Sequence, residues 1–420
     1  MITDEMRRFY ADDVRERFLR YVRVHTTSDE ASETTPSTPC QFDLARMLEG
    51  ELKEIGLQDV LCDAHSYTYG TLPAMKGCAS APPFGLLAHL DTSPDQPGEN
   101  VIPVRHEAWD GSPIRFPDDP GLRLTETDAP ELSRHAGETI ITASGKTLLG
   151  ADDKAGIAEI MAALATLQKF PELPHGAIRV CFTPDEEIGR GTVKLNLEKL
   201  PRYCYTMDGG APGELEAECF DAWRADLNFK GAGVHPGYAK NKMINASTVA
   251  ARFLAALPEW QTPEHTEGDE GFYHVTSISG DFENAEAGII IRDFEESINL
   301  ERIDYLKKTI EQFEKRYPGL KIDLKVRHQY RNMRDIIKEH PGVVETAVLA
   351  MENAGLKVHI KSIRGGTDGS ALTQKGHPTP NIFTGGFLFH SRKEWIAESN
   401  LNRAVETILH LAACWSRKGD

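Results

Sequence analysis

The sequence has few of the features that mark secreted, membrane or nucleic-acid-binding proteins. Its seven cysteines are odd in number and include no C-x-x-C spacing, which argues against a disulfide framework and a thiolate zinc site and favours a reducing compartment. No apolar run approaches the length needed to cross a membrane, and the charge-rich N-terminal residues lack the apolar stretch of a signal peptide. We therefore expect a cytoplasmic protein with no membrane partner.

Positive charge is scarce relative to negative charge. The chain has 47 Lys and Arg against 64 Asp and Glu, a formal net charge of -17. Such a surface repels phosphate groups, so nucleic acid and anionic membranes are excluded as main partners. The length of 420 residues and the hydrophobic fraction of 40% are sufficient for two domains that each bury a core.

What the sequence does contain is a series of histidines and acids near the ends of expected strands. These residues are His89 and Asp91 after the run 84–88, Asp185, Glu186 and Glu187 after 177–182, Asp208 after 203–207, and His390 after 381–383. In open α/β sheets, functional sites are built at the carboxyl ends of the strands. The pattern therefore indicates one shared site.

Two adjacent acids, Asp152 and Asp153, lie between small residues directly before the apolar helical segment 157–164. One isolated Asp in that position would be interpreted as a helix cap or dipole partner. Because other acids and histidines recur in similar settings, we interpret this junction as part of the same site.

The order of expected elements changes after residue 214. A β-α-β-β-α-β order is predicted there, with strands at 223–229, 272–277, 287–294 and 322–326 and helices at 246–257 and 300–316. This order predicts an α+β split-βαβ (ferredoxin-like) domain, residues 214–330, inserted in an α/β domain formed by 1–213 and 331–420. The Pro- and Gly-rich stretch between Asp91 and Asp152 is expected to be a surface insertion with little of the chemistry.

Seven motifs together resemble the peptidase T (tripeptide aminopeptidase) branch of the dinuclear zinc exopeptidase superfamily, which also includes carboxypeptidase G-type enzymes and aminoacylases. The motifs are His89-Leu90-Asp91-Thr92, Gly150-Ala151-Asp152-Asp153-Lys154, Thr183-Pro184-Asp185-Glu186-Glu187, Met207-Asp208-Gly209-Gly210, Val234-His235-Pro236-Gly237, Ile291-Arg292-Asp293-Phe294 and Arg364-Gly365-Gly366-Thr367-Asp368. Each is weak alone, but in this order they are specific.

The resemblance implies a zinc-exopeptidase-like mixed sheet flanked by helices, with the inserted domain as a lid or dimerisation domain. It implies two divalent metal ions per subunit, zinc being the expected metal, a cis peptide between Asp152 and Asp153, and a homodimer as one option. By the same match the metal ligands are His89, Asp152, Glu187, Asp208 and His390, with Asp152 bridging both ions.

The residue types suit that chemistry independently of the resemblance. Zinc accepts histidine nitrogen and carboxylate oxygen, and a water bound to it can have its pKa lowered to about 7. Glu186, next to the ligand Glu187, is the expected general base, and Asp91 is expected to fix the ring of His89 from the second shell. Taken singly, Glu186 would be a solvated acid at a helix start and Asp91 a turn former.

Three residues are candidates for substrate contacts. The resemblance makes His235 a donor to the scissile carbonyl, although a lone His in a Gly/Pro turn is more often a surface residue. Arg292 could read a peptide carboxylate, with an ion pair to Asp293 as the alternative. Arg364, before two glycines, is equally well explained as a surface charge at a strand end.

We therefore expect an aminopeptidase that releases the N-terminal residue of unblocked tripeptides by attack of a water bound to the two metals. Another amide hydrolase of the superfamily, such as a deacylase or carboxypeptidase, and a non-catalytic binding protein on the same fold are the alternatives. Leu388 and Lys393, on either side of His390, depart from the family pattern. These two residues leave open how strictly the enzyme prefers tripeptides over other peptides.

Overall fold

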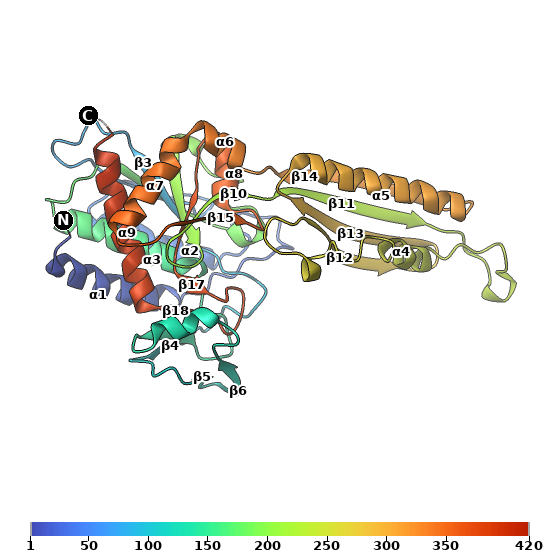
Figure 1. Cartoon of the computed structure of the whole chain (residues 1–420), viewed down its shortest axis with the longest axis horizontal. Helices are drawn as coiled ribbons and strands as arrows, with labels where there is room; N and C mark the ends of the chain where they lie inside the picture. Colours follow the sequence, from blue (N-terminus) through green and yellow to red (C-terminus); the bar gives the residue numbers. More distant parts are fainter. Residues whose placement is uncertain (1, 419–420) are drawn as a thin grey trace. The chain divides into compact units, whose positions relative to one another are not determined.

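The computed structural model describes residues 2–418, which form two compact units; Figure 1 shows their elements. The first unit comprises the chain up to Ala217, Ile336–Lys361 and the chain from Thr367 onward, and the second comprises Glu218–Asp335 and Ser362–Gly366. The second unit thus begins and ends a few residues later than the expected 214–330, and it includes a short segment after residue 361. Residues 1, 419 and 420 of the expected outer domain lie outside the described residues.

A mixed sheet of eight strands, in the order β1-β2-β8-β3-β9-β16-β10-β15, forms the centre of the first unit. Neighbours β8, β3, β9 and β16 run parallel, whereas β1, β2 and β10 pair in antiparallel fashion. The strands are β1 (Gln58–Cys62), β2 (Thr68–Leu72), β3 (Phe84–His89), β8 (Ile178–Thr183), β9 (Tyr203–Gly209), β10 (Glu214–Cys219), β15 (His359–Ile363) and β16 (Asn381–Phe383). The apolar strand β3 is buried along its whole length, as expected for a central parallel strand.

Helices of the first unit pack around a central, almost completely buried helix, α3. It contacts α1, α2, α9 and the strands β3 and β9. A Cβ at Gly156 would lie 2.1 Å from the carbonyl oxygen of Met207, so glycine is what lets α3 lie directly against β9. The helices are α1 (Asp4–Tyr21), α2 (Gln41–Ile55), α3 (Ala151–Lys169), α6 (Arg334–Glu339), α7 (Pro341–Asn353), α8 (Asp368–Gln374) and α9 (Glu398–Ser416).

The stretch between Asp91 and Asp152, expected as a surface insertion, contains short strands. Its strands β4 (Pro103–His106) and β7 (Ile140–Ala143) join β17 (Gly386–Phe387) and β18 (Trp395–Ala397) in a sheet of order β17-β18-β7-β4, and β5 (Ile114–Phe116) pairs with β6 (Asp119–Leu124). Trp109, Phe116 and Trp395 share a buried apolar cluster there. Because β18 follows His390 closely, this small sheet supports the segment that carries a predicted metal ligand.

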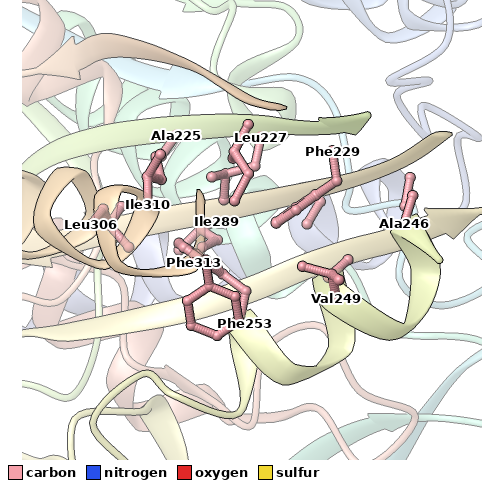
Figure 2. Close-up of a cluster of buried hydrophobic side chains, with 14 of the residues drawn as sticks. Ala225, Leu227, Phe229, Ala246, Val249, Phe253, Ile289, Leu306, Ile310 and Phe313 are labelled. Atoms are coloured by element: carbon pink, nitrogen blue, oxygen red, sulfur yellow. The ribbon is translucent and has the colours of Figure 1, made fainter. Parts of the chain in front are cut away.

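The second unit has the expected β-α-β-β-α-β order. It consists of β11 (Asp221–Lys230), α4 (Ala246–Leu254), β12 (Phe272–Gly280), β13 (Asn284–Asp293), α5 (Glu296–Arg316) and β14 (Lys321–Tyr330). The sheet has the order β12-β13-β11-β14 and is antiparallel throughout. Both helices pack on the sheet, and Phe229, Phe253 and Phe313 meet in its core with ring centroids 5.3–5.4 Å apart (Figure 2).

Short 3₁₀ helices occur in the connections of both units: η1 (Pro130–His135), η2 (Glu186–Ile188), η3 (Leu197–Lys199), η4 (Pro236–Tyr238) and η5 (Pro263–His265). Of these, η2 contains the two acids expected in the site. Among residues 2–418, no helix combines the length and apolar character required to span a bilayer.

Candidate metal centre

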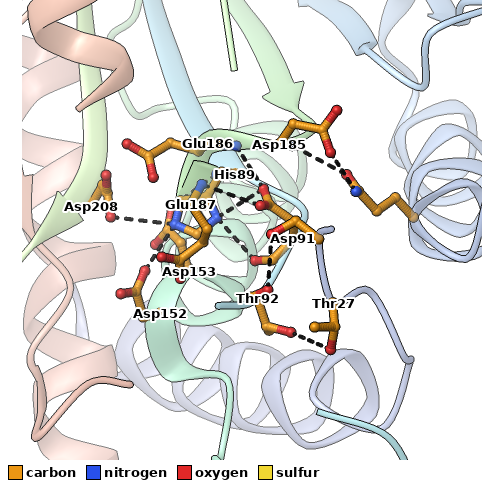
Figure 3. A network of polar contacts seen from close by, with 12 residues as sticks. Thr27, His89, Asp91, Thr92, Asp152, Asp153, Asp185, Glu186, Glu187 and Asp208 are labelled. Carbon is orange, nitrogen blue, oxygen red and sulfur yellow. Dashed lines mark hydrogen bonds and ion pairs between the residues drawn. The ribbon is translucent and has the colours of Figure 1, made fainter. Parts of the chain in front are cut away.

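Three neighbouring parallel strands bring side chains to one edge of the eight-stranded sheet. β3 ends at His89, β8 leads into the turn that carries Glu186 and Glu187, and β9 carries Asp208 near its end. Because β8, β3 and β9 are adjacent and parallel, their carboxyl ends meet. One imidazole and several carboxylates therefore gather at this edge (Figure 3).

Asp152 lies between the two predicted histidine ligands. Its Oδ1 is 2.8 Å from Nε2 of His89, and its Oδ2 is 3.3 Å from Nε2 of His390. On the outer sides, Nε2 of His89 lies 3.6 Å from Oδ1 of Asp208, and Nε2 of His390 lies 2.9 Å from Oε2 of Glu187. The structure thus brings all five predicted ligands together, with Asp152 at the centre.

Asp152 and His390 both lie at unusual backbone conformations. The peptide between Asp152 and Asp153 is cis, which confirms the expectation from the resemblance. His390 has a positive φ of 57°, and its Nδ1 lies 3.2 Å from Oδ2 of Asp95. Asp95 belongs to the stretch 92–151 and is the residue of that stretch that contacts a predicted metal ligand through this ion pair.

Asp91 connects His89 to the acidic turn. Its backbone oxygen lies 3.0 Å from Nδ1 of His89, whereas its carboxylate is 3.5 Å from the same nitrogen. The two carboxylate oxygens instead accept the backbone N–H groups of Glu186 and Glu187, at 3.0 and 3.2 Å. The main contact that orients the His89 ring is therefore made by the Asp91 backbone, while the carboxylate holds the turn.

Burial and mutual repulsion raise the pKa of several of these carboxyl groups. Burial, with repulsion from Asp152, raises the pKa of Glu187 to about 8. Burial and the nearby Asp208 raise the pKa of Glu186 well above its usual range. Hydrogen bonds to Asp152 and Glu187 raise the pKa of His390 to about 11. A site of this kind favours the binding of cations.

The residues present fit a metal centre. Ligand atoms lie within 4.8 Å of one another in two overlapping groups, one of His89, Asp152 and Glu187 and one of His89, Asp153 and Asp208. Oε1 of Glu187 is buried and has no hydrogen-bond partner among residues 2–418. A buried carboxylate oxygen of this kind calls for an explanation, and a cation supplies one. Imidazole nitrogen with carboxylate oxygen is a donor set that zinc accepts.

Known proteins resemble this chain along nearly its whole length. Residues 147–413 match the model of peptidase family M20/M25/M40. The chain is 47% identical over 408 residues to peptidase T of Bacillus velezensis, an alignment that covers 97% of this chain and 99% of that protein. The chain belongs to the peptidase T family. It is therefore a metallopeptidase, as the sequence motifs implied.

Solved structures share the fold of this peptidase T family member. A tripeptidase from Staphylococcus aureus superposes with a TM-score of 0.76 at 21% identity, covering 97% of this chain and 99% of that chain. A Bacillus subtilis protein described as a dinuclear metal-binding peptidase of the M20 family superposes with a TM-score of 0.64 at 15% identity, covering 96% and 98%. These likenesses confirm the mixed α/β sheet with an inserted antiparallel domain.

Two buried acids beside the centre of this metallopeptidase were not assigned from the sequence. Oδ2 of Asp153 accepts the backbone N–H of His89 at 3.0 Å, which ties the start of α3 to the end of β3. Its adjacency to Asp152 was a signal that could have been used. The second acid is Glu394, which follows Lys393, one of the two residues that depart from the family pattern.

Glu394 holds the loop that precedes α3. Its carboxylate accepts the backbone N–H groups of Leu149, Gly150 and Asp152, at 2.7, 2.8 and 3.1 Å. Burial raises its pKa to about 7, against the effect of these hydrogen bonds. Glu394, four residues after His390, thereby fixes the backbone of Asp152, whose carboxylate lies between His89 and His390.

The three predicted substrate residues all lie in the second unit. His235 is exposed, and its Nδ1 accepts the backbone N–H of Gly237 at 3.1 Å. In a neutral ring the proton then lies on Nε2, which leaves that nitrogen as a free donor. Arg364 donates to the backbone oxygens of Gly268 and Glu270, at 2.6 and 2.9 Å, so its guanidinium holds a loop of its own unit.

Arg292 is nearly buried and has no carboxylate within ion-pair distance in the described chain. Its Nη1 donates to the backbone oxygens of Trp223 and Ile291, both at 3.0 Å, and the guanidinium lies 5.5 Å from the ring centroid of Tyr330. The alternative ion pair with Asp293 does not form, because Asp293 pairs with Arg302.

Proposed function

We propose that this metallopeptidase releases the N-terminal residue from unblocked tripeptides. The observation that carries the proposal is the position of Asp152, with one carboxylate oxygen facing His89 and the other facing His390. Membership of the peptidase T family supports the substrate class, since a relative of similar length bears that name and a similar structure is described as a tripeptidase.

Two divalent ions, expected to be zinc, are the proposed cofactors. His89, Asp152 and Asp208 would hold one ion, and Asp152, Glu187 and His390 would hold the other. When bound, the ions supply Lewis acidity that makes a water molecule nucleophilic at neutral pH.

Glu186 is the proposed general base. Its carboxylate forms no hydrogen bond to another described residue, while its backbone N–H is held by Asp91. An Oε atom of Glu186 would take a proton from the attacking water and return it to the leaving amine. Its neighbour Glu187 points at His390, so the two successive acids can serve different roles.

The second unit would contribute to substrate recognition. We assign the free Nε2–H of His235 to the scissile carbonyl and the guanidinium of Arg292 to the terminal carboxylate of the peptide. The absence of an ion-pair partner for Arg292 among the described residues supports this role. Arg364 would act on the loop that it holds and not on the peptide directly.

Leu388 and Lys393, the two residues that depart from the family pattern, both contact other residues of the first unit. Lys393 pairs with Asp128 at 2.5 Å, and Leu388 packs against the apolar cluster around Trp395. A cytoplasmic location is also proposed, supported by seven free cysteines. The family resemblance implies a homodimer as one option, with the second unit as the dimerisation domain.

A panel of peptides tests the substrate. Free, N-acetylated and C-amidated peptides of two to four residues are incubated with the enzyme and added zinc, cobalt or manganese. Rapid release of the first residue from free tripeptides is expected, with dipeptides and N-acetylated peptides poor. Rapid cleavage of N-acetylated amino acids would assign the protein to the deacylases instead.

Metal analysis after mild dialysis tests the cofactors. The wild-type protein should retain two divalent ions, and Asp152→Ala should lose both because it removes the shared ligand. Asp12→Ala, on the exposed face of α1, is the matched control and should retain two. Two ions in Asp152→Ala would refute the bridging assignment.

A further inference from the structure

The segment Thr26–Gln41, which leads from the chain after α1 to the first residue of α2, is bound on one side to the chain just after Asp91. Thr92 donates its N–H to the oxygen of Thr26 at 3.3 Å and accepts the N–H of Ser28 at 3.2 Å. The hydroxyls of Thr27 and Thr92 lie 3.2 Å apart, as Figure 3 shows. This segment therefore lies beside the strand end that supplies His89.

On its other side the segment binds Asp185, the residue directly before the proposed base. Asp185 is fully buried and has a positive φ of 57°. Its carboxylate accepts the N–H of Ser37 at 2.8 and 2.9 Å, the Ser37 hydroxyl at 2.6 Å and Nε2 of Gln41 at 2.7 Å. The N–H of Asp185 returns a bond to Oε1 of Gln41 at 3.2 Å.

The acidic turn is consequently held from two directions. Asp91 binds the N–H groups of Glu186 and Glu187, and the Thr26–Gln41 segment binds Asp185. The backbone oxygen of Asp185 also accepts the N–H of Arg190 at 2.9 Å, and Nη1 of Arg190 donates to Ser32 in the same segment. A residue that needed only to form a turn would not require so many buried donors.

We propose that Asp185, through Ser37 and Gln41, is a positioning residue that fixes the direction of the Glu186 carboxylate. This inference rests on the proposed role of Glu186 as the base. Catalytic groups must be held close to their working geometry, and a shift of about 1 Å can lower the rate about 100-fold. The buried carboxylate with matched donors supplies that rigidity from a segment far away in the sequence.

Asp185→Asn tests the proposal because it keeps the shape and changes one acceptor into a donor. In either orientation the new NH2 group faces a donor, Nε2 of Gln41 at the Oδ1 position or the N–H of Ser37 at the Oδ2 position, so one hydrogen bond no longer matches. We expect kcat for a free tripeptide to fall about 10- to 100-fold, with KM within about threefold, both metal ions retained by metal analysis and a small change in Tm.

A double variant that exchanges the side-chain types at positions 185 and 41 distinguishes a positioning role of Asp185 from a general effect on stability. In Asp185→Asn with Gln41→Glu, the carboxylate and the amide trade places, the charge is conserved and residue 41 can accept from both donors of Asn at 185. This double variant should recover most of kcat, whereas Gln41→Glu alone, which sets two carboxylates face to face, should be as impaired as Asp185→Asn. Asp29→Asn, an exposed change in the same segment, should match the wild type.

The outcomes distinguish the inference from the function on which it rests. Normal kcat in Asp185→Asn, or no recovery in the exchanged pair, overturns the positioning role if Glu186→Gln is inactive. A loss of metal or of folded protein in proportion to activity also overturns it, in favour of a structural role. An active Glu186→Gln overturns the proposed base itself.

Discussion

At the scale of single residues, Glu186 and Glu187 show how two successive acids acquire different environments. Glu187 lies 2.9 Å from His390, whereas the Glu186 carboxylate has no hydrogen bond within the described chain. Their backbone N–H groups both donate to the Asp91 carboxylate. This fixes the backbone of the turn, so Glu186 and Glu187 cannot take each other's positions. Two acids that are adjacent in the sequence can thus have different roles, because successive side chains of a tight turn point in different directions.

Glu186→Gln should retain both metal ions and bind substrate with little change in KM, yet lose most of its turnover. The substitution preserves shape and removes the proton acceptor, and general-base catalysis contributes about 10²- to 10⁴-fold. Single-turnover kinetics and metal analysis on the same preparation check this. Near-normal turnover would mean that another residue takes the proton.

Glu394→Gln should weaken metal binding, although Glu394 is not a predicted ligand. Both of its oxygens accept backbone N–H groups of the loop that carries Asp152, and an amide would direct a donor at one of them. Loss of a supporting contact of this type costs about 10- to 100-fold in metal affinity. Titration with buffered free zinc gives the affinity, and Glu352→Gln, exposed on α7, is the control.

If Glu394→Gln bound zinc as tightly as the control, the loop before α3 would be held by its own conformation. Glu394 would then contribute to folding only.

At the scale of elements, α3 is distinctive because it is buried almost all round. One of its buried side chains is Glu159, and neither of its carboxyl oxygens has a hydrogen-bond partner among residues 2–418. Burial raises the pKa of Glu159 well above its usual range. The folded protein therefore keeps a proton on Glu159 at pH values where the unfolded chain releases it.

The contribution of Glu159 to the free energy of unfolding should consequently fall as the pH rises above about 4.5, where an unfolded Glu ionises. The folded state binds more protons than the unfolded state in this range, so each pH unit costs about 1.4 kcal/mol until the folded carboxyl itself ionises. Glu159→Gln carries no titrating group there. Its stability relative to the wild type should increase between pH 5 and pH 8.

Urea unfolding of the two proteins at several pH values measures this difference, and the contributions of shared groups cancel. Glu16→Gln, on the exposed side of α1, is the matched control. A pH-independent difference for Glu159→Gln would show that Glu159 is ionised in the folded protein.

At the scale of the whole molecule, the proposed functional residues are divided between the two units. The first unit contains all five proposed metal ligands and the base, whereas the second unit contains the three candidate substrate residues. A peptidase that selects peptides by length requires contacts at both ends of a short peptide, and substitution of Arg292 tests whether the second unit supplies one of them.

Arg292→Ala should lower kcat/KM for free tripeptides much more than for their C-terminal amides. The C-terminal amide lacks the negative charge that the guanidinium would bind. Its kcat/KM should therefore change little when Arg292 is replaced. Steady-state assays on matched acid and amide substrates measure the ratio. Arg327→Ala, an exposed change in β14 of the same unit, is the control. Equal losses on acid and amide would remove Arg292 from carboxylate recognition.

Much of this protein is determined by local sequence. Apolar runs identify the buried strands β3, β8 and β9, and alternating or helical apolar periodicity identifies the order of elements in the second unit. Burial on both faces of a strand gives a continuous run, whereas burial on one face gives a repeat. The acids and histidines at strand ends predict the candidate metal centre for a different reason, since adjacent parallel strands must end at one edge of the sheet.

Tertiary structure alone decided which distant residues support that centre. Ser37 meets Asp185 across 148 positions, and Glu394 meets the N–H of Asp152 across 242. The pairing of β7 with β18 likewise joins segments that have no shared pattern. A single hydrogen bond between a buried carboxylate and a backbone N–H leaves no periodic trace in a sequence. It exists only because the packing of α2, α3 and the small sheet brings both partners out of water together, where an unpaired group would be costly.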